Sequence, residues 1–172
     1  MVLSRIWAPW RAQYIHEGSA PSQPSPGCFL CRGITSREDR ENLVVDRRAH
    51  SVVVLNRYPY NNGHLLVAPC VHRSTLAELE GQDLIAPIQT VRRMTMILDR
   101  MLRPQGYNIG LNQGKASGAG LPGHLHWHLV PRWDGDTNFM PVLGHSKVIV
   151  ESLSEFYDRL LEEVRHEPGS PD

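Results

Sequence analysis

The chain has 172 residues, of which 41% are hydrophobic and 21% are charged, and this length is typical of one compact domain. Because 18 Lys and Arg residues balance 18 Asp and Glu residues, the chain lacks the basic field that general nucleic-acid binding requires. No apolar run reaches the roughly 18 to 20 residues of a membrane helix, and 3 cysteines are too few for a disulfide scaffold. We therefore expect a soluble, cytoplasmic protein without nucleic-acid or membrane partners.

We expect an N-terminal arm, a core and a short tail, which together form a single domain over residues 1–172. The arm over 1–27 ends in a stretch rich in Pro, Gly and Ser, a composition that prevents regular helix or sheet. Residues 28–165 form the predicted core. Residues 166–172 form the tail.

Strand patterns dominate the first half of the predicted core. Apolar runs rich in β-branched residues predict strands at 43–45, 51–55 and 64–68. A polar turn at 56–63 joins the second and third of these strands, and it contains Pro and an Asn-Asn-Gly sequence. The pattern predicts an antiparallel pair with a shaped, polar turn.

Helices and strands alternate in the second half. Apolar residues at steps of three and four predict a long helix over 81–103 and a second helix over 153–164. Strands are predicted at 107–112 and 124–130, and the loop between them contains four glycines within 114–123. Few helices among several strands indicate an α+β fold.

Three of the nine histidines alternate with apolar residues in His124-Leu-His126-Trp-His128-Leu-Val. Because successive side chains of a strand point to opposite faces, the three imidazoles share one face of the predicted strand. Such a row suits a metal centre, in which histidines two residues apart bind one ion, or nucleophilic catalysis, in which a neutral imidazole attacks an electrophile. The glycine-rich loop upstream favours phosphoryl chemistry, since its backbone N–H groups can approach a phosphate closely.

The histidine segment resembles the signature of the histidine triad superfamily, whose members are nucleotide-binding hydrolases and transferases that form a covalent nucleotidyl-histidine. Residues 55–69 resemble its nucleoside-binding hairpin, and residues 107–114 resemble the strand and loop before the triad. Residues 7–11 and 130–139 are similar to a phosphorolytic branch of the superfamily. The resemblance covers roughly residues 5–165 and implies an antiparallel sheet of about five strands, one long helix, a C-terminal helix and a homodimer.

The resemblance also implies roles for individual residues. His126 corresponds to the nucleophile, His128 to the histidine beside the phosphate oxygens and leaving group, and His64 to a remote fourth histidine. Asn56 corresponds to the ribose contact, and Gln113 corresponds to an amide that contacts the phosphate. Without the resemblance, an Asn in a turn and a Gln in a loop are more typical of turn and solvent-facing positions.

The loop before the triad departs from the family pattern. Many members carry Gly-Gln-Ser or Gly-Gln-Thr there, whereas residues 118–122 of this chain read Gly-Ala-Gly-Leu-Pro. Backbone N–H groups, Ser117 or Lys115 would have to replace the missing side-chain donors. The sequence therefore does not specify which leaving group is preferred. Water and phosphate both stay possible as acceptors, and Lys115 and Arg132 are the basic residues next to the loop and the triad strand.

Cys28 and Cys31 have a spacing that lets two thiolates bind one tetrahedral ion. Alone they supply half of a zinc site, so a redox pair or two reduced, unliganded thiols are alternatives. In zinc-containing members of the superfamily the other two ligands match His72 and His124, and His50 is a competing candidate. The resemblance therefore implies a structural zinc that leaves the other two triad histidines available for catalysis.

Together these features predict a nucleotidyl hydrolase or transferase that acts on the α-phosphate of dinucleoside polyphosphates, such as diadenosine tetraphosphate, or of related nucleoside phosphates. The resemblance implies a nucleotidyl-His126 intermediate that water or phosphate resolves. One alternative is a metallohydrolase with a catalytic ion on His124, His126 and His128. Another is a non-catalytic protein that binds nucleotides or that uses zinc to stabilise an interaction surface.

Overall fold

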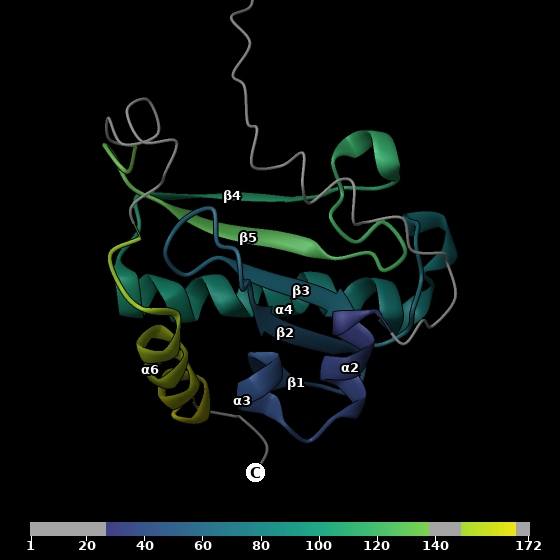
Figure 1. The fold of residues 1–172 in the computed structure, drawn as a ribbon, viewed down its shortest axis with the longest axis horizontal. Helices are drawn as coiled ribbons and strands as arrows, with labels where there is room; N and C mark the ends of the chain where they lie inside the picture. The colour runs from purple at the N-terminus through teal and green to yellow at the C-terminus, as the bar shows by residue number, and fades with distance from the viewer. Residues whose placement is uncertain (1–26, 138–148, 168–172) are drawn as a thin grey trace, which may run out of the picture.

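Five antiparallel strands form one sheet in the computed structural model, which describes residues 27–137 and 149–167. The strand order is β1-β2-β3-β5-β4, so β1 and β4 are the edge strands (Figure 1). The α+β class and the antiparallel sheet of five strands are therefore confirmed. The strand bounds are β1 Val44–Arg47, β2 Ser51–Leu55, β3 Leu65–Pro69, β4 Gly106–Leu111 and β5 Trp127–Arg132.

Parts of the sequence prediction lie outside the described residues. These parts are the N-terminal arm up to residue 26 with its 7–11 segment, the end of the 130–139 segment, and residues 168–172 of the tail. The structure therefore describes the predicted core apart from residues 138–148, together with the first residues of the tail.

The helix α4 (Gly81–Leu102) runs along one face of the sheet, and α6 (Leu153–Arg165) lies beside it (Figure 1). The buried side chains of Met94, Ile97 and Leu98 join the inward-facing residues of β2, β3 and β5 in the main core. The helices predicted over 81–103 and 153–164 are confirmed to within one residue. Although α4 has 22 residues, no helix in the described ranges is long and apolar enough to cross a membrane.

A short helix, α2 (Phe29–Thr35), covers the opposite face of the sheet, and α3 (Asp39–Asn42) connects it to β1. Leu30 of α2 packs with Val52 and Val54 in a second apolar cluster. The sequence pattern predicts no element in this region, because helices of seven and four residues are too short to show a clear helical period.

The strand predicted over 124–130 begins later, at Trp127. Its two neighbours, β3 and β4, both stop pairing with it at that residue. Upstream, the N–H of Leu125 donates to the carbonyl of Arg73 at 2.7 Å, outside any strand ladder. The alternation nevertheless continues, because Leu125, Trp127 and Leu129 are all buried in the core under α4.

The strand register places His128 on the face opposite α4. Leu66 pairs with Val54 on one side and with His128 on the other, and His128 pairs in turn with Gly110 of β4. Residues directly opposite each other share a face, and Val54 packs in the cluster with α2. No described atom lies within 4 Å of the position that a Cβ of Gly110 would take, so the sheet surface beside His128 is open.

Gly63→Ala is expected to destabilise the fold more than Gly81→Ala. Both glycines have a left-handed φ, of 74° and 52°, and this conformation costs about 1 kcal/mol for a residue with a Cβ. A Cβ on Gly63 would lie 2.9 Å from Leu102 and 3.2 Å from both Phe156 and Pro131, whereas Gly81 has open space. Overpacking should add about 1–3 kcal/mol for Gly63 alone. Chemical denaturation of both variants tests this, and equal losses would contradict the packing argument.

Candidate functional site

The predicted histidine face divides into two groups. The rings of His126 and His128 lie together, with centroids 5.0 Å apart. The ring of His124 is directed at two cysteines, and its Nδ1 is 3.4 Å from the Sγ of Cys28 and 3.5 Å from the Sγ of Cys31. The first group offers imidazole nitrogens for group and proton transfer, and the second offers ligands for a metal ion.

The imidazole of His126 is held in one tautomer. Its Nδ1 lies 2.8 Å from the backbone carbonyl oxygen of His124, and because a carbonyl can only accept, Nδ1 carries the proton. The residue is 4% exposed, and burial lowers the pKa of His126, so the ring is neutral at neutral pH. Its Nε2 therefore carries a lone pair, as a nucleophilic imidazole requires.

A chain of hydrogen bonds also fixes the proton of His128. The backbone N–H of Tyr60 donates to Nδ1 of His64 at 3.0 Å, so the proton of His64 lies on Nε2. That Nε2–H donates to Nδ1 of His128 at 2.9 Å. His128 consequently carries its proton on Nε2, the nitrogen from which it can donate a hydrogen bond to a leaving group.

His64 must be neutral for this chain of hydrogen bonds to form. Burial, together with the nearby His128 and His126, lowers the pKa of His64 to about 3. An imidazolium would have no lone pair to accept the N–H of Tyr60. Burial therefore makes His64 a fixed link between the turn and His128 rather than a proton carrier near neutral pH.

The two amides predicted to contact substrate occupy different surroundings. Asn56 lies beside the ring of His64, with its Nδ2 3.2 Å from Nδ1, and its Oδ1 accepts the N–H of Tyr58 at 3.0 Å. The Oε1 of Gln113 accepts the N–H of Leu76 at 2.8 Å, which leaves the NH2 group of Gln113 as the donor toward a ligand. Asn56 thus shapes the turn, and Gln113 is anchored on the segment after β3.

Lys115 and Ser117 lie in the glycine-rich loop, in the 3-10 turn η2 (Lys115–Ser117). The hydroxyl of Ser117 donates to the carbonyl of Gly114 at 2.7 Å, so its proton is used within the turn. Lys115 is exposed. Arg132 is bound by Asp136, whose two oxygens lie 2.6 and 2.8 Å from its Nε and Nη2. Of the two basic residues, Lys115 therefore suits an anionic ligand better.

Tyr60 is a site residue that the sequence analysis missed. Its ring stacks against that of His128, with centroids 5.8 Å apart and an interplanar angle of 18°. It also lies 4.6 Å from the ring of His64. The only signal in the sequence is its place in the turn between β2 and β3. The contacts themselves depend on how that turn lies against His128 of β5, which a sequence pattern does not show.

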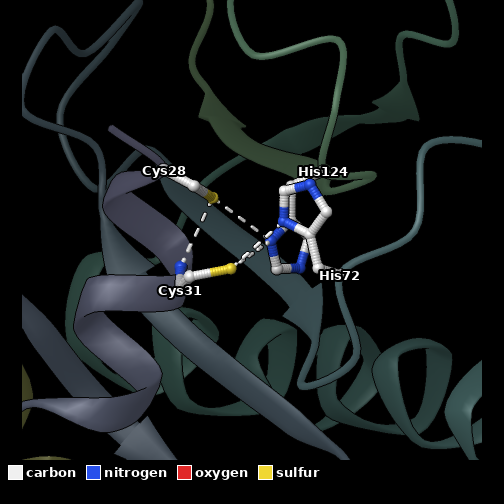
Figure 2. Close-up of side chains that lie close together, drawn as sticks. All are labelled: Cys28, Cys31, His72 and His124. Atoms are coloured by element: carbon white, nitrogen blue, oxygen red, sulfur yellow. Dashed lines mark hydrogen bonds between the residues drawn. The ribbon is translucent and has the colours of Figure 1, made fainter. Parts of the chain in front are cut away.

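Four possible metal ligands converge at the N-terminus of α2 (Figure 2). The ligand atoms of Cys28, Cys31, His72 and His124 all lie within 4.8 Å of one another. The Sγ of Cys31 is 3.1 Å from Nδ1 of His72, and the Sγ of Cys28 accepts the N–H of Cys31 at 3.4 Å. The structure thus brings together the four residues that the family resemblance implies.

The geometry of this group suits a tetrahedral zinc ion. Sulfur and nitrogen ligands of zinc lie about 3.5 Å apart when the bonds are about 2.0–2.3 Å long, and the sulfur–nitrogen distances named above are 3.1, 3.4 and 3.5 Å. The Nε2–H of His124 donates to the carbonyl of Pro69 at 3.0 Å, so Nδ1 presents its lone pair to the cysteines. Burial and the nearby Cys28 raise the pKa of the Cys31 thiol to about 12, and a bound cation would favour the thiolate.

His50 and Cys70 do not join the metal-ligand group. The Nδ1 of His50 pairs with a carboxylate oxygen of Asp83 at 2.8 Å, and the Sγ of Cys70 lies 3.5 Å from the carbonyl of Arg48. In the part of the chain that the structure describes, no second set of three or more His, Cys, Asp and Glu side chains lies close enough to hold an ion. The geometry therefore does not support the alternative of a catalytic ion bound by all three triad histidines.

The chain is similar to known proteins both in sequence and in structure. The sequence profile of the HIT domain matches residues 37–135. An AP-4-A phosphorylase from Mycobacterium tuberculosis is 38% identical over 172 aligned residues, which cover 96% of this chain and 87% of that protein. The structure of a Zn-bound histidine triad family protein from Mycobacterium smegmatis matches 80% of this chain and 92% of its own, with a TM-score of 0.63 and 22% identity. A hypothetical histidine triad nucleotide-binding protein from Sulfolobus tokodaii matches 80% and 89%, with a TM-score of 0.62 and 25% identity.

The low pKa of His64 should make the stability of the fold depend on pH. Its pKa is about 3 in the folded chain against an ordinary value of 6.5, so between these values the unfolded state binds more protons. The free energy of unfolding should therefore fall as the pH drops below about 6.5, by up to about 1.4 kcal/mol per pH unit from this residue. His64→Gln should flatten this dependence in chemical denaturation at about pH 7 and about pH 5. An unchanged slope would show that His64 does not titrate as described.

Proposed function

The chain belongs to the HIT domain family, and on this premise we propose that it is a nucleotidyl hydrolase or transferase that acts on dinucleoside polyphosphates. The observation that carries the proposal is the tautomer of His126, whose Nδ1–H is bound to the carbonyl of His124. A neutral imidazole with its lone pair on Nε2 can attack an α-phosphorus without first losing a proton. The relative from Mycobacterium tuberculosis, an AP-4-A phosphorylase, supports this substrate class.

The proposed reaction consists of two transfers at the α-phosphorus. First, Nε2 of His126 attacks phosphorus, the P–O bond to the leaving polyphosphate breaks, and a nucleotidyl-histidine forms. The Nε2–H of His128 donates a hydrogen bond to the leaving oxygen, which departs with the electron pair as an anion, and the carbonyl of His124 stabilises the positive charge on the His126 ring. Second, an oxygen of the acceptor attacks the same phosphorus, the P–N bond breaks with its electron pair returning to Nε2 of His126, and any proton on the attacking oxygen passes to solvent.

We further propose that inorganic phosphate is the acceptor. The identity of 38% to a phosphorylase extends over 96% of this chain, which supports phosphorolysis over hydrolysis. A phosphate acceptor needs a cation or several N–H donors near the nucleotidyl group. Lys115, the basic residue of the glycine-rich loop, is exposed and suits this role, whereas Arg132 is neutralised by Asp136.

Incubation with diadenosine tetraphosphate, with and without inorganic phosphate, tests this function. Phosphorolysis should give ADP and ATP, whereas hydrolysis would give AMP and ATP. His126→Ala should lower turnover by about three orders of magnitude or more, because no neighbouring group can replace the nucleophile. His166→Ala, at the exposed end of α6, should not change turnover. Full activity of His126→Ala would contradict the role of His126, and AMP as product at millimolar phosphate would make the chain a hydrolase.

We also propose that Cys28, Cys31, His72 and His124 hold a structural zinc ion. Four protein ligands fill the tetrahedral shell of zinc, so the ion would supply a cross-link rather than an activated water. It would tie the start of α2 to the segment after β3 and to the triad. The Zn-bound protein from Mycobacterium smegmatis, which has the same fold, supports this choice of metal.

Cys28→Ser should reduce both the zinc content and the melting temperature of the protein. Wild-type protein refolded with zinc should hold about one ion per chain, and losing a ligand lowers stability because metal binding is coupled to folding. Cys70→Ser is the matched control, since Cys70 lies outside the ligand group and should leave the zinc content unchanged. Elemental analysis and thermal denaturation provide the measurements. Zinc-free wild-type protein after refolding with zinc would rule out the site.

We propose a homodimer formed at the edge of the sheet that β4 provides. Ile109 of this strand is 51% exposed, and Ile85, Ile88 and Met96 of α4 are exposed as well. An edge strand can pair with a second copy, and exposed apolar side chains are typical of an interaction surface. A monomeric mass in analytical ultracentrifugation would contradict this proposal.

A further inference from the structure

A cluster of hydrogen-bonded polar side chains, which we call the hub, lies where β5 ends and consists of Asn61, Arg132 and Asp136. The proposed reaction does not use it. The side chain of Asp136 is 7% exposed and accepts two hydrogen bonds from Arg132 and one from the N–H of Trp133 at 3.2 Å. Asp136 also accepts from Nδ2 of Asn61 at 2.8 Å, and Asn61 comes from the turn between β2 and β3. The hub therefore ties the end of β5 to the turn that precedes His64.

Asn61 makes the connection on the side of the turn. It is 7% exposed, and its Nδ2 donates to the carbonyl of Pro131 at 3.1 Å as well as to Asp136. Its own carbonyl accepts the N–H of His64 at 3.3 Å, and the N–H of the preceding Tyr60 donates to the ring of His64. Tyr60 and Asn61 thus hold His64 by its ring and by its backbone, while the Asn61 side chain fixes both residues to β5.

The charges of the hub make it a firm anchor. Arg132 pairs with Asp136 through two nitrogens, and its Nη1 donates to Asn108 of β4 at 2.5 Å. Two-point contacts between a guanidinium and a carboxylate are short and directional, and here they neutralise a buried charge. The part of the 130–139 segment that the structure describes therefore serves as an anchor, and Arg132 is not available to bind phosphate.

We propose that Asn61 and Asp136 are positioning residues for nucleotidyl transfer. By fixing the turn to β5 they keep the N–H of Tyr60 on Nδ1 of His64, which keeps the proton of His64 on Nε2. That arrangement in turn keeps the proton of His128 on Nε2, where the Nε2–H donates a hydrogen bond to the leaving group. The inference rests on the proposed function, since it concerns the hydrogen bond that His128 donates there.

Asn62 provides a matched control for Asn61. It is the next residue of the same turn and has the same side chain, but its Nδ2 donates to Glu151 at 3.3 Å instead of to the hub. Alanine at either position removes an amide that ties the turn to another part of the fold. Only the loss of Asn61 should disturb the ring of His64.

The test combines 15N NMR of the histidine rings with steady-state kinetics on the full-length protein. In Asn61→Ala, His64 and His128 should show mixed tautomers, and kcat for diadenosine tetraphosphate should fall about tenfold or more with KM within about twofold. Asn61→Leu should behave in the same way, because it keeps about the size of the side chain, removes the donor and adds no charge beside Asp136. It serves as the test variant if the alanine protein does not fold. Asn62→Ala should keep the wild-type tautomers and kcat, even if its melting temperature falls.

Wild-type tautomers in a folded Asn61 variant would overturn the proposal. Equal changes in tautomer and kcat in Asn62→Ala would also overturn it, because they would reflect a general loosening of the turn. If the wild-type protein shows no turnover while the tautomers respond as expected, the proposed function fails and the anchoring of His64 is supported. The ring signals thus separate the two claims.

Discussion

The hydrogen bond from Nδ1 of His126 to the backbone carbonyl of His124 determines the chemistry of the site. It forces the lone pair onto Nε2, and burial keeps the ring neutral. The bond depends on the extended backbone around it, because alternate residues of an extended chain share a face. Leu125 and Trp127 are buried on the other side, so a slip by one residue would bring histidines into the apolar core.

The extended segment that holds this bond continues beyond the sheet. Pairing with β3 and β4 ends at Trp127, so upstream of that residue other contacts replace the strand ladder. One is the bond from the N–H of Leu125 to Arg73. Another is the approach of the His124 ring to the two cysteines and His72. There the proposed zinc would bind the extended segment to the start of α2 and to the segment after β3. His124 therefore links the metal-ligand group, through its ring, to the nucleophile, through its carbonyl.

Strong periodicities in the sequence predicted much of this fold, and contacts between distant segments account for the rest. The alternation around His126 placed the histidines on one face, and the long apolar stripe predicted α4 to within one residue. The pattern could not show that β5 starts at Trp127, because that limit depends on where its neighbours stop pairing. Nor could it show that Arg132 is bound to Asp136, since the sequence shows only a basic residue at the end of the triad strand, where it could equally well bind a phosphate. The proton positions on the rings depend on hydrogen-bond partners such as the N–H of Tyr60, which only the folded hairpin supplies.

In the proposed mechanism, Nε2 of His126 forms a covalent bond to the substrate phosphorus. Rapid mixing with diadenosine tetraphosphate without phosphate, quenched in alkaline denaturant because P–N bonds are labile in acid, allows the mass of the intact chain to be measured within one turnover. We expect a mass increase of one adenylyl group, which peptide mapping assigns to His126. An unmodified chain during active turnover, or an adduct on another residue, would contradict it.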